Sequence, residues 1–328
     1  MIEETFKNTI KSYELLKRND KLMLGVSGGP DSMCLFELFS RLKEEYRLNL
    51  VCVHFNHGLR PSADKEEEFV RNACKKQGIR FISEKKDVRK FFKGDSLEQT
   101  ARNLRFDFFL KCARQVKIKK IALGHHKDDL VETVLMRLIR GAGLRGLRGF
   151  QPRSKYKSLS VIRPLIEIDK SKILDWLRKR NISYCLDESN LEDKFLRNKI
   201  RLKLLPLLKE LNPNITQNLY NLSRSISLDY DFIYAVAFNA FNSLKRRHSA
   251  KELCLDLEGL KKLSQAVFNH VIRIAIEELK GDVRRIEGRH LEEIRDLVLR
   301  RPSASIVDLP SLLVKKEQKL LHIQILIL

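Results

Sequence analysis

The chain has 328 residues, of which 64 are Lys or Arg and 42 are Asp or Glu, so its formal net charge is +22 at pH 7. Apolar residues make up 43% of the sequence, which is enough for a hydrophobic core and excludes a disordered tail protein. No apolar run approaches the roughly 20 residues of a membrane-spanning helix, which excludes an integral membrane protein. The excess of cations favours a polyanionic partner such as nucleic acid over a merely solubilising surface.

Cysteine usage and the start of the chain bear on the cellular compartment. The cysteines occur singly in apolar segments and none forms a CxxC pair, which is typical of buried thiols in a reducing environment. The opening segment, MIEETFKNTI, carries acids early and has no apolar signal region. We therefore expect a cytoplasmic protein.

Short apolar runs alternate with helical patterns over the first 170 residues. This alternation predicts an α/β fold, with a parallel sheet covered by helices on both faces. Strands are predicted at residues 21–26, 48–55, 80–88, 120–124 and 161–168, and helices at 31–45, from 62 onward, at 96–116, at 128–140 and through 176. Ligands of such folds bind at the carboxyl ends of strands, where the clusters SGGPDS, HFNHGLR and GHHKDD fall.

The character of the sequence changes after Asn212, Pro213 and Asn214. From residue 215 to about 299 the patterns are almost all helical, and a short β-like tail follows. We therefore expect two domains, a catalytic one at 1–212 and a mostly helical one at 213–328.

The SGGPDS cluster has the composition of a phosphate-binding turn between a strand and a helix. Its glycines let the backbone approach a ligand closely, and the helix N-terminus presents free amides to an anion. An ordinary glycine turn is the alternative. Asp31 would repel phosphates unless a Mg²⁺ ion lay between them. The candidate phosphate-binding residues are Ser27, Gly28, Gly29, Pro30, Asp31 and Ser32.

The GHHKDD cluster opens a predicted helix. Asp129 and Glu132 are three residues apart and so share a helix face, with His126 beside them. A transition-metal site is one interpretation, but HExxH is missing; acids that favour a helix N-terminus are another. We favour a site for a cation, either Mg²⁺ or an amine.

Arginines recur on predicted helices and in a glycine-rich loop. Arg102 and Arg105 share one helix face, and Arg197 and Arg201 share another. Such pairs are ordinarily solvated, and they bind phosphate only where the face borders a cleft. The loop RGAGLRGLRGF suits a nucleic-acid backbone, with a plain surface loop as the alternative. The candidates in this loop are Arg140, Arg145 and Arg148.

Taken together, these motifs resemble the tRNA(Ile)-lysidine synthase family of N-type ATP pyrophosphatases, also called PP-loop proteins. They appear in family order from about residue 21 to 206 as SGGPDS, HFNHGLR, ARNLRFDFF, GHHKDDLVETVLMRLIRGAGLRGLRGF, IRPLIEI and DESNLEDKFLRNKIR. The resemblance implies a two-step reaction. ATP adenylates the C2 carbonyl oxygen of the wobble cytidine in a CAU-anticodon isoleucine tRNA and releases pyrophosphate. The ε-amine of free L-lysine then attacks C2 and expels AMP to give lysidine.

The resemblance also implies roles for the candidate residues. The SGGPDS residues would hold the phosphates of ATP, and Asp31 would hold Mg²⁺. Asp129 and Glu132 would bind the lysine ammonium, with one of them or His126 as the base. Arg105 and Arg201 would stabilise phosphate or transition-state charge, and Arg140, Arg145, Arg148 and Arg197 would contact tRNA. The family further suggests a homodimer without a membrane partner.

The sequence differs from the usual pattern of this family at two positions. Leu130 stands where many relatives carry Gln, and Phe150 where Met is common. The chain also resembles the compact members with one C-terminal domain.

Two other functions are alternatives to this interpretation. One is a PP-loop tRNA thiolation enzyme, which would need reactive cysteines or an iron–sulfur cluster, and the other is a non-catalytic tRNA-binding module. Basic residues of the second domain are expected to grip tRNA: Lys245, Arg246, Arg247, Arg284, Arg285, Arg300 and Arg301.

Overall fold

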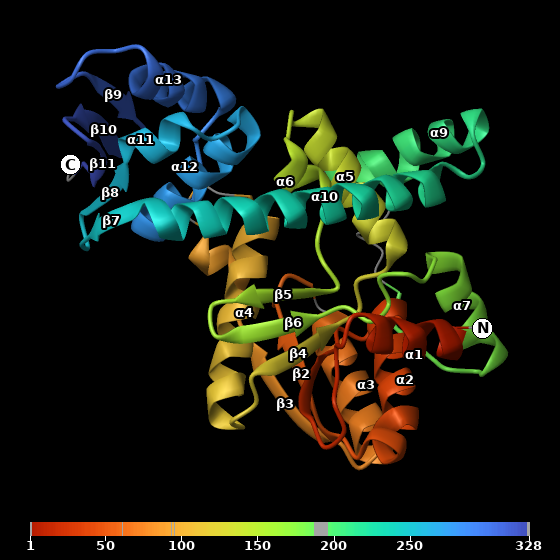
Figure 1. Ribbon diagram of the computed structural model, residues 1–328. Coiled ribbons are helices and arrows are strands. Elements are labelled where there is room, and N and C mark those ends of the chain that lie inside the picture. Colours follow the sequence, from red (N-terminus) through yellow and green to blue (C-terminus); the bar gives the residue numbers. More distant parts are fainter. Residues whose placement is uncertain (1, 61, 93, 95, 187–195, 327–328) are drawn as a thin grey trace. The chain divides into compact units, whose positions relative to one another are not determined.

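The computed structural model describes residues 2–60, 62–92, 94, 96–186 and 196–326, which form two compact units, Met1–Arg224 and Ser225–Leu328 (Figure 1). Residues 187–195 of the DESNLEDKFLRNKIR motif lie outside the described residues. The two units divide inside helix α10 (Ile215–Leu244), whereas the domain boundary predicted at 212/213 falls between α9 and α10 and stays a prediction. Of the helices in the described ranges, none is both long and apolar enough to cross a membrane.

A six-stranded sheet forms the centre of the first unit. Its order is β3-β2-β1-β4-β6-β5, and every pairing is parallel except that of β5 with β6. The predicted parallel sheet is therefore confirmed, while β5 is an antiparallel edge strand that the polar sequence RSKY did not indicate. The strands are β1 (Lys21–Gly25), β2 (Asn49–Asn56), β3 (Arg80–Lys85), β4 (Lys120–Leu123), β5 (Arg153–Tyr156) and β6 (Leu159–Ile162).

Helices cover both faces of this sheet, as the alternating pattern predicted. Apolar side chains of α1, α2, α3 and α7 pack on one face, and those of α4 pack on the other. The helices are α1 (Ile2–Ser12), α2 (Pro30–Tyr46), α3 (Ser62–Lys76), α4 (Leu97–Gln115), α5 (Lys127–Ile139), α6 (Leu144–Leu147), α7 (Lys170–Lys179), α8 (Leu196–Lys199) and α9 (Leu205–Leu211), with a 3₁₀ turn at Val88–Phe91 and a π-helical turn at Ile200–Leu204.

The strand order reverses between β1 and β4, and this reversal places two polar clusters side by side. The chain passes from β1 outward through β2 and β3, then returns to add β4 on the other side of β1. The segments that leave the carboxyl ends of β1 and β4 therefore meet at the crevice where open α/β sheets bind ligands. A Cβ atom at Gly124 would lie 3.0 Å from the backbone carbonyl of Asp31 and 3.1 Å from the Ser32 nitrogen, so only glycine lets α2 approach β4 this closely.

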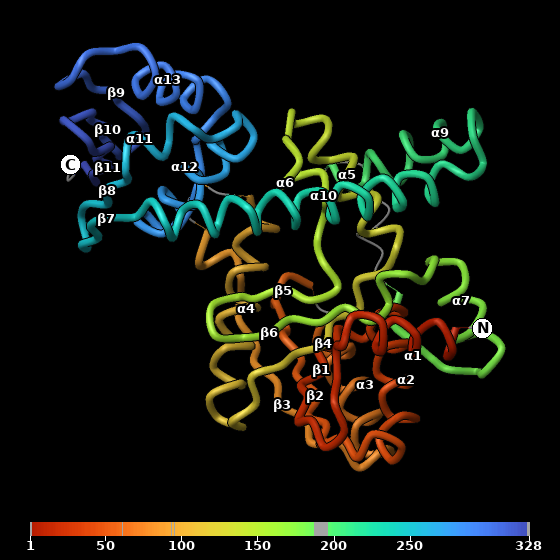
Figure 2. The backbone as a smooth tube through the Cα atoms, viewed as in Figure 1, coloured from red at the N-terminus to blue at the C-terminus, as the bar shows by residue number. Residues whose placement is uncertain are grey.

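The second unit contains a five-stranded antiparallel sheet of order β7-β8-β11-β10-β9, with α12 and α13 packed on it. Figure 2 follows its backbone from α10 to the C-terminus. Its elements after α10 are β7 (Lys245–His248), β8 (Glu252–Asp256), α11 (Leu257–Lys261), α12 (Gln265–Lys280), α13 (Gly288–Leu299), β9 (Ile306–Leu309), β10 (Leu312–Glu317) and β11 (Leu320–Ile325).

The prediction that residues 215–299 are almost all helical is wrong for β7 and β8. The sequence ELCLD is a short apolar run, and such runs are equally compatible with a buried helix segment and a strand. Pairing of β8 with β11, which lies about 70 residues later in the chain, decides the outcome. The β-like tail was correctly assigned, since β9, β10 and β11 all form there.

Substituting Gly124 tests the close approach between α2 and β4. We expect Gly124→Ala to lower the free energy of unfolding by about 1–3 kcal/mol, because the added methyl group overpacks against rigid backbone. Gly143→Ala is the matched control, since a Cβ atom there meets nothing within 4 Å. Urea unfolding followed by circular dichroism measures both variants, and equal losses would contradict the role given to Gly124.

Candidate functional site

The predicted phosphate-binding residues form one loop between β1 and α2. The Ser32 hydroxyl accepts hydrogen bonds from the backbone nitrogens of Ser27 and Gly28, both at 3.1 Å, and donates to the Gly29 carbonyl at 2.9 Å. Gly28 has φ +94°, a conformation that favours glycine, and Pro30 occupies the first turn of α2. The loop is therefore held in shape by Ser32, and the positive end of the α2 dipole lies beside it.

A cluster of carboxylates surrounds His126, at the start of α5. Its Nε2 lies 3.6 Å from Asp31 Oδ1 and 3.4 Å from Asp129 Oδ2, and its Nδ1 lies 3.6 Å from Asp128 Oδ2. Burial lowers the pKa of His126, but the charge of Asp129 and the nearby carboxylates of Asp128 and Asp31 outweigh it and raise this pKa to about 10. The structure thus brings the predicted residues Asp31, His126 and Asp129 together.

Lys170, at the start of α7, completes this cluster and was not anticipated from the sequence. Its Nζ donates to Asp31 Oδ1 at 2.5 Å, and its backbone nitrogen donates to Asp128 Oδ2 at 2.8 Å. Burial raises the pKa of Asp31, but His126 and Lys170 more than offset this and hold the pKa below its usual value. Lys170 lies two residues after the IRPLIEI motif, and that position is the one signal that could have identified it.

Glu132 is almost completely buried, one helical turn after Asp129, and is paired with arginine. Arg201 donates to both of its carboxylate oxygens, from Nε at 2.6 Å and from Nη2 at 3.0 Å. Arg197 Nε lies 3.4 Å from Glu132 Oε2, and its Nη2 donates to Thr133 Oγ1 at 3.0 Å. Burial raises the pKa of Glu132 further than the arginines lower it. Arg201 lies in the π-helical turn, a geometry frequent at functional sites.

A second cluster, of cations, surrounds His125. Burial and the charges of Arg163, Arg105, Arg102 and Arg197 lower the pKa of His125 well below its usual value. Burial followed by the charge of Arg102 lowers the pKa of Arg105 and of Arg163 to about 10 each, although Glu98 opposes this at Arg105. Among the described residues, the buried Nε atoms of Arg105 and Arg163 have no hydrogen-bond partner. Unsatisfied buried guanidinium groups indicate an anion site.

The sequence identified part of this cation cluster. Arg105 and Arg197 were candidates, and their helix faces do border polar neighbours rather than open solvent. Arg163 and His125 were missed, although both lie inside quoted motifs. Arg163 stacks over Phe150 at 5.2 Å from the ring centroid and donates to the Gln151 carbonyl at 2.8 Å.

The glycine-rich loop after α5 is tightly turned. Arg137 Nη1 donates to the carbonyls of Gly146 and Gly149 at 2.7 and 2.9 Å, which closes the loop on the end of α5. Arg140 and Arg145 are exposed on this loop, and the Arg148 carbonyl accepts a hydrogen bond from Ser223 at 3.0 Å. Of the four arginines predicted to contact tRNA, three are in this loop, and two of these three are exposed to solvent.

The HFNHGLR cluster stabilises local structure. His54 Nδ1 lies 2.9 Å from the Val26 carbonyl, just before the phosphate-binding loop, and burial lowers the pKa of His54. Asn56 donates to Asp64 Oδ1 at 2.8 Å and accepts from the Gly58 nitrogen at 3.0 Å. These contacts fix the turn that follows β2.

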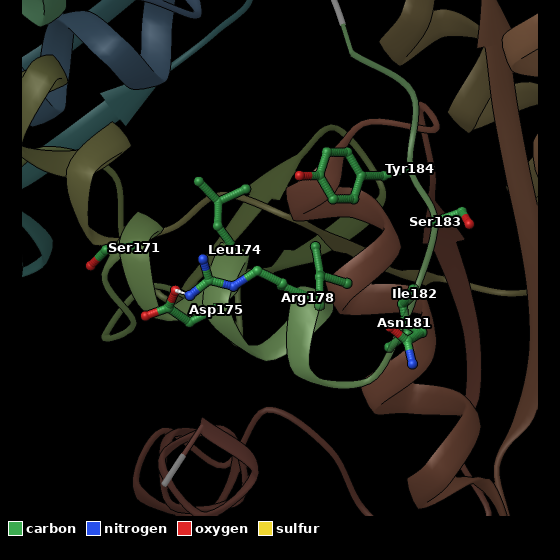
Figure 3. A pocket seen from close by; sticks show the side chains of 9 residues that line it. Ser171, Leu174, Asp175, Arg178, Asn181, Ile182, Ser183 and Tyr184 are labelled. Atoms are coloured by element: carbon green, nitrogen blue, oxygen red, sulfur yellow. Dashed lines mark hydrogen bonds and ion pairs between the residues drawn. The ribbon is translucent and has the colours of Figure 1, made fainter.

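A pocket of about 690 Å³ lies along α7 and the segment after it (Figure 3). Leu174, Arg178 and Tyr184 are among the residues that line it, and Arg178 pairs with Asp175 at 2.8 Å in an exposed position. None of the candidate residues lines this pocket. The candidate site is therefore the pair of charged clusters at the ends of β1 and β4.

Comparison with protein families agrees with this geometry. Residues 1–208 match the PP-loop domain family, and residues 255–322 match the TilS substrate binding domain family. The first match covers the sheet and both charged clusters, and the second covers most of the antiparallel sheet unit.

Curated relatives extend the match over most of the chain. The tRNA(Ile)-lysidine synthase of Clostridioides difficile is 34% identical over 90% of this chain and 64% of its own length. That of Clostridium tetani is 36% identical over 88% of this chain and 62% of its own length. The chain thus spans less than two thirds of these two relatives. The tRNA(Ile)-lysidine synthase of Petrotoga mobilis is 32% identical over 88% of this chain and 95% of its own length.

Among solved structures, the U34-tRNA thiolase NcsA from Methanococcus maripaludis, with its [4Fe-4S] cluster, matches with a TM-score of 0.59. It is 20% identical, and the match covers 69% of this chain and 78% of that protein, so it supports the fold alone. With the sheet, both family matches and relatives above 30% identity in agreement, the chain belongs to the tRNA(Ile)-lysidine synthase family of PP-loop proteins.

Proposed function

We propose that this chain joins free L-lysine to C2 of the wobble cytidine of a CAU-anticodon isoleucine tRNA, using ATP and forming lysidine. The observation that carries the proposal is the separation of charge at one strand end. A carboxylate cluster around His126 and a guanidinium cluster around His125 occupy neighbouring positions after β4. The reaction needs both, since it combines a cationic amine with a polyphosphate and a polynucleotide.

The first step is adenylation of the cytidine. Membership of the PP-loop family implies use of ATP. In the proposed step, O2 of the cytidine attacks the α-phosphorus of ATP and pyrophosphate leaves. The loop of Ser27, Gly28 and Gly29 and the N-terminus of α2 favour the negative charge of the departing phosphates. Lys170 and the arginines of the second cluster supply further positive charge.

The donor chemistry at Asp31 fits Mg²⁺. Asp31 and Asp129 each place a carboxylate oxygen beside His126 Nε2, and oxygen atoms are the ligands that Mg²⁺ prefers. We assign Asp31 to hold the ion, which would neutralise charge on the phosphates. Lys170 and His126 keep the Asp31 carboxylate oriented.

The second step needs a group that binds the lysine ammonium and favours its deprotonation. The reference pKa of a lysine amine is about 10.4, so the amine arrives protonated at neutral pH. Asp129 is the better placed of the two predicted carboxylates, because Glu132 already accepts two hydrogen bonds from Arg201. We therefore assign Asp129 to the amine and Glu132 to the positioning of Arg201; general-base catalysis by a member of this cluster stays a prediction.

The arginine cluster supports binding of the tRNA backbone near the reacting base. Arg105 and Arg163 keep unsatisfied nitrogens in a buried region, and phosphate oxygens would satisfy them. Arg140 and Arg145 are exposed on the neighbouring loop and would contact the backbone further out. Assembly as a homodimer is retained as a prediction that light scattering can check.

The rival thiolation chemistry lacks a suitable cysteine in the structure. Five of the six cysteines are buried and Cys185 is half-buried. Burial raises the pKa of the Cys34 and Cys185 thiols, and it raises that of Cys112 to about 11. A sulfur carrier needs an accessible thiolate. The second rival, a tRNA-binding module without catalysis, is separated by ATP–pyrophosphate exchange, which a simple binder would not support.

Substituting Asp129 tests the assignment of the amine site. The protein is incubated with ATP, labelled lysine and a CAU-anticodon isoleucine tRNA transcript, and the nucleosides are analysed. We expect Asp129→Ala to abolish lysine incorporation while tRNA still binds, because the ammonium loses its carboxylate. Asp175→Ala, an exposed acid on α7 paired with Arg178, is the control and should retain turnover. Normal incorporation by Asp129→Ala would refute the assignment.

Substituting Glu132 tests whether this carboxylate positions arginine. Glu132→Ala leaves Arg201 and Arg197 without their buried partner, so we expect the free energy of unfolding to fall by about 3 kcal/mol. Glu68→Ala removes an exposed partner of Arg71 and should cost less than about 1 kcal/mol. Urea unfolding compares the two variants, and similar losses would contradict a buried pairing role.

Basic residues of the second unit are the proposed tRNA grip, and the structure narrows the candidates. Lys245 pairs with Glu278, Arg246 with Asp256 and Arg301 with Asp296, so part of their charge is neutralised within the unit. Arg284 and Arg285 are adjacent, exposed residues in the segment between α12 and α13. Arg284 and Arg285 are therefore the better residues for testing whether the second unit binds tRNA.

We expect the double variant Arg284→Ala/Arg285→Ala to weaken tRNA binding. The slope of the logarithm of the tRNA-binding constant against the logarithm of salt concentration should fall in magnitude by up to about 2, because tRNA binding then makes fewer phosphate contacts and releases fewer counterions. The matched control is Arg178→Ala/Lys179→Ala, which removes the same charge from α7. Filter binding between low and high salt measures both. An unchanged slope in the first variant, or equal changes in both, would contradict a specific grip.

A further inference from the structure

One polar cluster lies in the second unit and includes none of the residues of the candidate active site. Strands β8 and β11 pair antiparallel, with His322 opposite Cys254 and Gln324 opposite Glu252. Leu253 and Leu255 belong to the hydrophobic core beneath α12 and α13. Because side chains alternate across a strand, Glu252 and Cys254 share the opposite face of the sheet with His322.

The three side chains are close enough to share one ion. Cys254 Sγ lies 3.3 Å from His322 Nδ1, and His322 Nδ1 lies 2.8 Å from Glu252 Oε1. All three ligand atoms lie within 4.8 Å of one another. Tetrahedral Zn²⁺ with ordinary bond lengths separates a thiolate sulfur from an imidazole nitrogen by about 3.5 Å and a nitrogen from a carboxylate oxygen by about 3.3 Å. We infer that Cys254, His322 and Glu252 bind Zn²⁺ or a similar borderline-soft divalent ion.

Surrounding groups orient these ligands in the way metal sites require. A ligating histidine ordinarily directs its second ring nitrogen toward a carboxylate, and His322 Nε2 lies 3.7 Å from Glu317 Oε2. Gln324 Nε2 donates to Glu252 Oε1 at 2.8 Å, which fixes the carboxylate. Three protein ligands then leave the fourth tetrahedral position to water.

Nucleophilic catalysis by Cys254 does not fit the same geometry. In a catalytic triad the nucleophile and the carboxylate bond to different ring nitrogens, whereas Cys254 and Glu252 both approach Nδ1 of His322. Cys254 is also fully buried, so a substrate could not reach it. An ion bound between the three ligand atoms would account for the approach of both groups to one nitrogen.

Ion binding would change the state of the thiol. Burial and the charge of Glu252 raise the pKa of the Cys254 thiol, although Arg247 on β7 opposes this. A bound divalent ion holds a thiolate, so the thiol proton is released to solvent on binding. The ion would then join β8 to β11 at the centre of the sheet and stabilise the second unit.

The test uses the full chain, stripped with a chelator and titrated with ZnCl₂ by calorimetry, with metal content checked by mass spectrometry. We expect one ion per chain, a rise in the melting temperature, and a thiolate-to-metal absorption band when Co²⁺ replaces Zn²⁺. Cys254→Ser should lose all three signals. His248→Gln is the matched control, because His248 pairs with Glu278 at 3.2 Å and is not one of the three proposed ligands, so this variant should bind as the unmodified chain does.

Further variants keep the outcome decisive if Cys254→Ser does not fold. His322→Gln and Glu252→Gln should each abolish the stoichiometric site, and Gln324→Ala should weaken binding by about tenfold, because it removes only an orienting hydrogen bond. Substoichiometric binding to the unmodified chain, the absence of a thiolate band with Co²⁺, or unchanged binding in folded Cys254, His322 or Glu252 variants would overturn the inference.

Discussion

The close contact between Gly124 and the first turn of α2 is the constraint on which the site depends. It allows the loop that leaves β1 and the loop that leaves β4 to touch, backbone against backbone. Asp31 from the first loop then reaches His126 and Asp129 from the second. Without this approach, the phosphate-binding residues and the carboxylates of α5 would belong to separate surfaces.

Two adjacent histidines experience opposite electrostatic surroundings. His126 is enclosed by carboxylates, which raise its pKa to about 10 against the effect of burial. His125 is buried among arginines, and its pKa falls well below the usual value. Clusters of like charge are costly to bury without partners, so their retention at one strand end points to ligands of opposite charge. Glu132 pairs with Arg201 and lies 3.4 Å from Arg197, which limits that cost.

Much of the first unit could be predicted because its elements obey simple periodicities. The bounds predicted from continuous apolar runs and from clear apolar helix faces are nearly correct, as for β2 and α2. The edge strand β5 and the strands β7 and β8 could not be predicted, since their short sequences gain strand geometry only from a paired neighbour. Lys170 was missed for a similar reason: a lysine at a helix start is ordinarily solvated, and only the fold brings it to Asp31.

The sequence by itself determined the α/β class of the first unit, the surplus of positive charge, and the loop and helix that carry the candidate residues. It also placed the side chains of Asp129 and Glu132 on one helix face, since residues three apart share a helix face. The tertiary structure decided which of these carboxylates is already engaged, because Arg201 reaches Glu132 across 69 residues of sequence. It likewise joined Cys254 to His322 across 68 residues. Periodicity describes which way a side chain points from its own backbone, whereas its partner and its burial depend on strand order and packing between distant segments.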